Sequence, residues 1–143
     1  MHNITRMKIE KPVGDVFEAF VDPSKIGGFW FSSSSERWEE GKVITLRYDE
    51  YEAQGDIKIK EIDLNEKIVF HWGTNEEGNK VTIILNELGH SESIIEITEE
   101  GFNENDENII SVMLDNKEGW VYMLTCLKGY LEYGVHLRAS LIH

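Results

Sequence analysis

The segment that most constrains the fold lies near the carboxyl end, where residues 120–133, WVYMLTCLKGYLEY, have the spacing of an amphipathic helix. The apolar residues recur every three or four positions and form one wide stripe: Trp120, Met123, Leu124, Leu127 and Leu131. A helix of this kind must bury its stripe, and the rest of the chain offers mainly strands as partners. Laid across a curved sheet, the helix either fills the concave side or roofs a cavity. The sequence leaves both arrangements open.

Between the first helix and this last one, apolar and polar residues alternate in short runs, a pattern typical of half-buried strands. Turn-forming residues such as Glu39-Glu40-Gly41 separate the runs. The connections are too short for crossover helices, so we expect antiparallel pairing in a sheet that twists and curls. The predicted strands are residues 37–38, 42–51, 53–63, 67–72, 79–88 and 91–99.

The amino-terminal part predicts a strand at 4–10, then a helix from Val13 to about Val21 that Asp22-Pro23 ends. Ser24 is expected to cap a second, short helix that Gly27-Gly28 ends. The stretch 109–114 fits either a short helix or extended chain. Asp115 or Asn116 is the expected cap of the final helix.

Length and charge narrow the classes of function. The 143 residues fit a single domain, 1–143, and the net charge of −13 argues against nucleic acid or an anionic membrane as partner. No apolar run reaches the length of a membrane span, and the first residues lack the apolar stretch of a signal peptide. We therefore expect a cytoplasmic protein. Its single cysteine, Cys126, lies beside the apolar stripe and is interpreted as a packed hydrophobe.

Three strings carry a resemblance to a known family: PVGDVFEAFVDPSKIGGFW at 12–30, EGKVITLRYDEYEAQGDIKIKEIDLNEKIVFHW at 40–72, and EGW at 118–120 with the helix behind it. Their order and spacing resemble the AHSA-type group, relatives of an activator of a heat-shock protein's ATPase, in the START/SRPBCC, Bet v 1-like helix-grip superfamily. The resemblance implies an α+β fold, in which a curved antiparallel sheet of about six to seven strands wraps around a long C-terminal helix, with two short helices after strand one. It also implies a link to the stress response.

Two features depart from that pattern. Gly27-Gly28 stands where the family commonly carries larger or basic residues before the tryptophan. The tail 135–143, VHLRASLIH, extends past the usual end of the helix, and packing on the surface, an oligomer contact and disorder all remain open for it.

Aromatic residues are the main candidates for a binding site, because their rings bury large apolar areas while an indole keeps an N–H donor. They either wall a cavity for a small apolar or amphipathic molecule or simply fill the core, and family relatives often enclose a cavity. Phe29 and Phe31, beside the glycine pair, are the expected gate. The expected ligand-binding residues are Trp30, Trp38, Tyr48, Phe70, Trp72, Trp120 and Leu124.

Polar residues in the strands offer no convincing catalytic set. Arg47 and His71 are expected on the outer face, while Glu99 and Glu100 are interpreted as solvated charges at a strand end. The five histidines are scattered, so the sequence predicts no metal site, no cofactor and no catalytic residue.

The sequence thus favours non-catalytic binding of a small hydrophobic or amphipathic molecule. The alternatives are a chaperone cofactor or protein-interaction module, as the family name implies, and an enzyme such as a cyclase, dehydratase or hydrolase acting on hydrophobic substrates. Tyr122, Tyr130 and Tyr133 lie off the apolar stripe, which predicts a possible homodimer through the outer face of the last helix or through the tail.

Overall fold

A seven-stranded antiparallel sheet, in the order β1-β7-β6-β5-β4-β3-β2, forms the frame of the protein. The computed structural model describes residues 1–142, and His143, the end of the tail, lies outside the described residues. The strands are β1 (His2–Ile9), β2 (Ser33–Ser34), β3 (Val43–Tyr48), β4 (Ala53–Asp63), β5 (Lys67–Trp72), β6 (Lys80–Glu87) and β7 (Ser93–Glu100). The helices are α1 (Val13–Val21), the 3₁₀ turns η1 (Ile26–Gly28) and η2 (Asp49–Tyr51), and α2 (Ile109–Tyr133).

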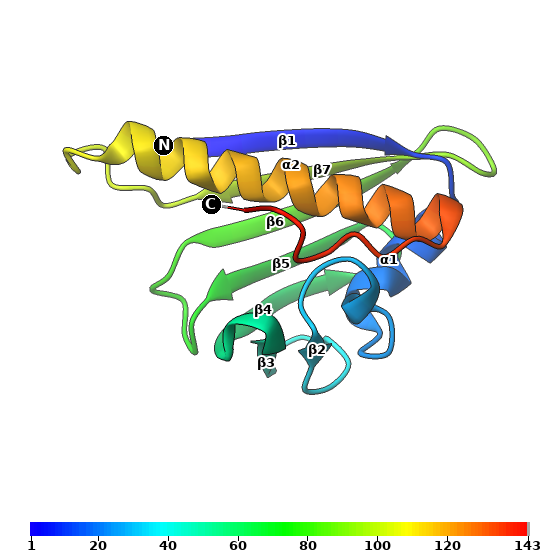
Figure 1. Cartoon of the computed structure of the whole chain (residues 1–143), viewed down its shortest axis with the longest axis horizontal. Coiled ribbons are helices and arrows are strands. Elements are labelled where there is room, and N and C mark those ends of the chain that lie inside the picture. The colour runs from blue at the N-terminus through cyan, green and yellow to red at the C-terminus, as the bar shows by residue number, and fades with distance from the viewer. Residues whose placement is uncertain (143) are drawn as a thin grey trace.

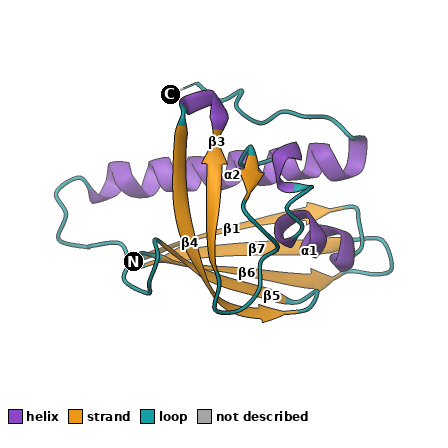
Figure 2. Cartoon of the chain, turned by 90° about the horizontal axis from the view of Figure 1, so that it is seen from below, coloured by secondary structure: helices purple, strands orange, loops and turns teal. Residues whose placement is uncertain are grey.

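The sheet curls around the long helix, so the predicted helix-grip architecture is confirmed. Figure 1 shows α2 running alongside β1, and Figure 2 shows β3 and β4 rising out of the layer formed by β1, β7, β6 and β5. A bulge between Ile59 and Glu61 shifts the register of β4 against β5 at this bend. Bulges increase local twist, which helps β4 leave the plane of its neighbours. In the described residues, no helix is both long and apolar enough to cross a membrane.

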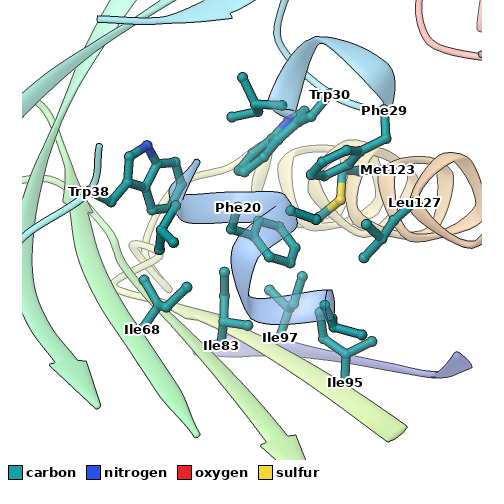
Figure 3. Close-up of a cluster of buried hydrophobic side chains, with 14 of the residues drawn as sticks. Phe20, Phe29, Trp30, Trp38, Ile68, Ile83, Ile95, Ile97, Met123 and Leu127 are labelled. Atoms are coloured by element: carbon teal, nitrogen blue, oxygen red, sulfur yellow. The ribbon is translucent and has the colours of Figure 1, made fainter. Parts of the chain in front are cut away.

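The core lies between the inner face of the sheet and the two helices (Figure 3). Buried inward positions alternate along β6 and β7, as the period of two requires, for example Ile95 and Ile97 of β7. Phe20 of α1 contacts Phe29 edge-on, with ring centroids 5.3 Å apart. The stripe of α2 that is fully or nearly fully buried consists of Trp120, Met123, Leu124, Cys126 and Leu127. Burial of such side chains is worth about 1.5–3 kcal/mol each and supplies the main driving force for the fold.

Four local predictions were wrong. The N-cap of η1 is Lys25 and not Ser24, and residues 49–51, expected at the end of a strand, form the turn η2. Residues 37–38 are not a strand: the Trp38 N–H donates to the carbonyl of Val21, which fixes this segment against α1. The last helix begins at Ile109, six positions before Asp115, and Asn108 is its N-cap. The Asp106 carboxylate accepts from the Asn108 N–H, so an Asx turn sets the helix start that periodicity could not locate.

The glycine pair that departs from the family pattern has a steric reason. A Cβ on Gly28 would lie 2.7 Å from Cζ of Tyr130 and closer still to two other ring carbons. A Cβ on Gly27 would lie 2.8 Å from the Ser32 carbonyl oxygen. The chain therefore needs glycine here so that η1 can approach α2, where the Tyr130 ring stacks on Phe29 with centroids 5.9 Å apart.

The tail reverses direction at the end of α2. Gly134 adopts a left-handed conformation (φ +66°), its N–H donates to the Tyr130 carbonyl, and the Val135 N–H donates to the Gly129 carbonyl. This αL-type ending sends the tail back alongside the helix, as Figure 1 shows in red. The Tyr122 hydroxyl donates to the Leu137 carbonyl and accepts from the Ser140 N–H, which holds the tail there.

Candidate functional site

A pocket of about 380 Å³ lies between the sheet, α2 and the returning tail. Its size falls within the range of small-molecule sites. Exposed lining residues, including Tyr51, Asp115 and Ala139, place its mouth between η2, α2 and the tail. The pocket is lined by Phe29, Trp30, Phe31, Tyr48, Tyr51, Trp72, Glu99, Asp115, Asn116, Gly119, Trp120, Tyr122, Met123, Arg138, Ala139 and Leu141.

Three indole rings contribute to the pocket wall. The centroid of Trp30 lies 5.5 Å from that of Trp120 and 6.4 Å from that of Trp72, and the last two rings are also 6.4 Å apart. Phe31 continues the wall toward Tyr48, with centroids 4.5 Å apart. Each of these rings is therefore in contact with another aromatic ring of the wall.

Glu99 of β7 forms the polar part of the wall and is only 4% exposed. Its Oε1 accepts from the indole N–H groups of Trp72 (3.3 Å) and Trp120 (3.1 Å) and from the side-chain amide of Asn116 (3.0 Å). Its Oε2 accepts from the side-chain amide of Asn79 (3.0 Å). All four partners donate, an arrangement that suits a carboxylate, which can only accept.

The prediction that Glu99 is a solvated charge was therefore wrong, whereas Glu100 is exposed as expected. The missed signal is strand alternation: Glu99 continues the inward series Ile95, Ile97. The indole donors of Trp72 and Trp120 are also not free for a ligand, contrary to expectation, because Glu99 occupies both.

Arg138 of the tail also lines the pocket. Its guanidinium pairs with the Glu50 carboxylate through two hydrogen bonds, its Nε donates to the Trp30 carbonyl (2.7 Å), and it lies 5.7 Å from the ring centre of Tyr48. The hydrogen bonds from Arg138 lower the pKa of Glu50 to about 2. Burial raises the pKa of Tyr48 to about 12, so this hydroxyl stays neutral near pH 7.

The structure brings some of the expected site residues together and separates others. Trp30, Tyr48, Trp72 and Trp120 line the pocket, as do the expected gate residues Phe29 and Phe31. The remaining three are buried core residues that do not line it: Trp38, Phe70 and Leu124. The Trp38 ring is held by α1 and by a hydrogen bond from its N–H to Ser34 Oγ (3.3 Å), which keeps it behind the pocket wall.

The polar residues of the strands do not all reach the pocket. Tyr48 and Glu99 reach the pocket, but Arg47 is exposed and bonds to Asp49 and Gln54. His71 is outside the pocket and buried, with its Nδ1 3.0 Å from the Gly78 carbonyl oxygen, because the turn between β5 and β6 folds over it. Across residues 1–142, no three metal-ligating side chains of the His, Cys, Asp or Glu type come close enough together to hold an ion.

A curved sheet around a long carboxyl-terminal helix, with an aromatic pocket between them, defines a helix-grip protein. The chain belongs to the family described as Activator of Hsp90 ATPase homolog 1-like protein, which matches residues 10–132. The resemblance expected from the three sequence strings is confirmed. No curated protein matches the chain.

Solved structures support the same assignment. A protein from Staphylococcus saprophyticus is 51% identical, with 96% of each chain covered and a TM-score of 0.85. The Aha1 dimer from Colwellia psychrerythraea is 17% identical over 94% of this chain and 98% of that one, with a TM-score of 0.80. DynU16, from the dynemicin biosynthetic locus, is 18% identical over 94% of this chain and 48% of that one, with a TM-score of 0.78. The last two likenesses establish the fold alone.

Proposed function

We propose that the protein binds a small hydrophobic or amphipathic molecule in the pocket between the sheet and α2, without catalysing a reaction on it. The observation that supports this proposal is a preformed, partly open pocket of about 380 Å³ walled by Trp30, Trp72 and Trp120. Apolar burial supplies most of the affinity, at about 25 cal/mol per Å² before the costs of ordering the ligand.

The ligand-binding residues of this proposal are those of the pocket wall. Trp30, Tyr48, Trp72 and Trp120 contact the ligand, with Phe29 and Phe31 beside the glycine pair as its gate. Trp38, Phe70 and Leu124 support these rings from behind.

Gly119 provides the variant that tests the proposal. It lines the pocket from α2, and a Cβ built on it meets no atom within 4 Å. Gly119→Phe is expected to obstruct the pocket, whereas Gly119→Ala adds one methyl group and leaves it open. Both replace a helical glycine, so the alanine variant controls for the change in helix propensity.

The measurement combines native mass spectrometry of freshly purified protein with a titration of the neutral dye Nile red, followed by tryptophan fluorescence. We expect a co-purified molecule or saturable dye binding in the wild type and in Gly119→Ala, and its loss in Gly119→Phe. The absence of both signals in the wild type, or binding that Gly119→Phe leaves intact, would overturn the proposal.

The second candidate is a chaperone cofactor, and membership of the Activator of Hsp90 ATPase homolog 1-like family favours it. The test is the ATPase rate of an Hsp90-class chaperone with increasing amounts of this protein. A saturable rise in rate would support this function, and a flat response at concentrations well above that of the chaperone would exclude it.

A homodimer through the outer face of α2 or through the tail is a further proposal. Tyr122 and Tyr130 contact the tail and η1 of their own chain, so they do not supply the contact. Three other apolar residues on one face of the helix are 74%, 65% and 42% exposed: Ile110, Leu114 and Val121. The related Aha1 from Colwellia psychrerythraea was solved as a dimer. Light scattering of the wild type and of Leu114→Glu tests this, and a wild-type monomer at micromolar concentration would reject it.

We also propose that residues 1–143 act as one domain in the cytoplasm, without nucleic acid or membrane as partner. The net charge of −13 and the single buried cysteine support this setting. Cell fractionation and limited proteolysis check the location and the domain boundaries.

A further inference from the structure

Glu99 is a buried carboxylate that has no cationic partner among the described residues. Its hydrogen bonds come from two indoles and two amides, all of them neutral, and no Lys, Arg or His of residues 1–142 lies within 4.0 Å of it. Buried glutamates are otherwise nearly always paired with a cation. Glu132 shows the usual solution in the same chain, because its 5% exposed side chain pairs with Lys128 at 2.6 Å.

The neutral donors satisfy the oxygens of Glu99 but do not cancel its charge. Four N–H groups hold the carboxylate in place, and Asn3 donates to Asn116 Oδ1 (3.0 Å), which fixes the amide that donates to Glu99. A burial cost remains as long as the negative charge has no counter-charge. The side chain borders the pocket, so a counter-charge can reach it from there.

The pocket wall around Glu99 also favours positive charge. Trp72 and Trp120 direct their N–H edges at the carboxylate and also line the pocket. Aromatic faces attract cations, most strongly those of tryptophan and in sites with little water. Asp115 adds a second carboxylate near the mouth, while Arg138, the one Lys or Arg that residues 1–142 contribute to the lining, is already paired with Glu50.

We propose that the pocket selects an organic cation, namely a quaternary or protonated amine that carries apolar groups. The positive nitrogen lies beside Glu99 against Trp72 and Trp120, and the apolar part lies against Phe31 and Tyr48. This inference rests on the proposed ligand-binding function and adds the charge of the ligand to it. Anionic ligands such as carboxylates are rejected, because they would meet the unpaired charge of Glu99.

Three probes of nearly the same size test the proposal: benzyltrimethylammonium, its uncharged carbon isostere neopentylbenzene, and phenylacetate. Binding is followed by tryptophan fluorescence and by ligand-observed NMR at low salt. We expect benzyltrimethylammonium to bind at least about tenfold more tightly than neopentylbenzene, and phenylacetate to bind most weakly. Equal affinity for the cation and its isostere, or tighter binding of phenylacetate, would overturn the inference.

Two matched variants identify the group responsible. Glu99→Gln removes the charge inside the pocket, and Glu100→Gln removes the same charge from the next residue of β7, which is exposed on the other face. We expect the preference for the cation over neopentylbenzene to disappear in Glu99→Gln and to persist in Glu100→Gln. A preference that survives Glu99→Gln contradicts the assigned role.

The outcomes separate this inference from the proposed function. If Glu99→Gln does not fold, the affinities of the wild type for the cationic, neutral and anionic probes decide whether the charge inference holds. If neopentylbenzene binds as well as the cation, the charge inference fails and the proposed function stands. If none of the three probes binds, the inference fails, and the Nile red titration decides whether the pocket binds ligands at all.

Discussion

Replacing Gly28 by alanine is expected to destabilise the protein through a single clash. The new Cβ would lie 2.7 Å from Cζ of Tyr130 and closer to Cδ1 and Cε1, whereas carbon atoms in ordinary contact are about 3.5–4.0 Å apart. The ring cannot move freely, because it stacks on Phe29 and meets His136 edge-on at 5.6 Å. Either the helix α2 or the turn η1 must shift.

Overpacking of this kind typically costs about 1–3 kcal/mol. For a chain of this length, 1 kcal/mol lowers Tm by about 4 °C, so Gly28→Ala is expected to lower Tm by about 4–12 °C. Thermal unfolding followed by circular dichroism measures the change. The shift of α2 or η1 in Gly28→Ala also affects the pocket, because Phe29 contributes to the pocket wall and Tyr130 stacks on the Phe29 ring.

A double-mutant cycle with Tyr130→Ala tests the reasoning, since that variant removes the ring and with it the clash. Tyr130→Ala alone loses packing, but adding Gly28→Ala to it is expected to cost almost nothing further. The reasoning is refuted if Gly28→Ala leaves Tm unchanged. It is also refuted if Gly28→Ala lowers Tm by the same amount with and without the Tyr130 ring.

Three further predictions follow from other parts of the structure. Gly119→Ala is expected to raise stability by about 0.5–1 kcal/mol in thermal unfolding, because alanine favours the helix and its Cβ meets nothing; a fall in Tm would contradict this. Arg138→Gln is expected to lower Tm more at neutral pH than near pH 2. The lowered pKa of Glu50 means that the ion pair stabilises fully above about pH 4.5 and is lost as pH falls toward 2, whereas the hydrogen bond to the Trp30 carbonyl does not depend on pH, so a pH-independent difference would refute the assignment. Burial raises the pKa of the Cys126 thiol, so a thiol reagent is expected to label native protein at least about a hundredfold more slowly than unfolded protein, and equal rates would show that the site is open.

The sequence alone determined the architecture, because the signals for strands, helix ends and the apolar stripe are local or periodic. Apolar and polar runs and the turn residues between them placed β4 and β5 at their observed bounds, Asp22-Pro23 ended α1, and the apolar stripe identified the gripped helix. Periodicity could not locate the start of α2. An Asx turn at Asp106 sets it, and Asp106 lies among other polar loop residues that show no periodic pattern.

The composition of the pocket was decided only by the tertiary structure. Whether an aromatic ring faces a void or fills the core depends on neighbours far away in the chain, which is why Trp72 lines the pocket and Trp38 lies behind it. The tail becomes part of the site because Gly134 turns it back, so that Arg138 reaches Glu50, 88 positions earlier.

Glu99 shows most clearly what the sequence determines and what the tertiary structure determines. The period of two already directed its side chain inward, but its meaning came from partners that folding gathers: Asn79, Asn116 and the two indoles lie between 17 and 27 positions away. Sequence periodicity sets the face on which a side chain stands. Only the folded chain decides whether that face offers the carboxylate a cation, water or neutral donors, because charges interact with whatever is close in space.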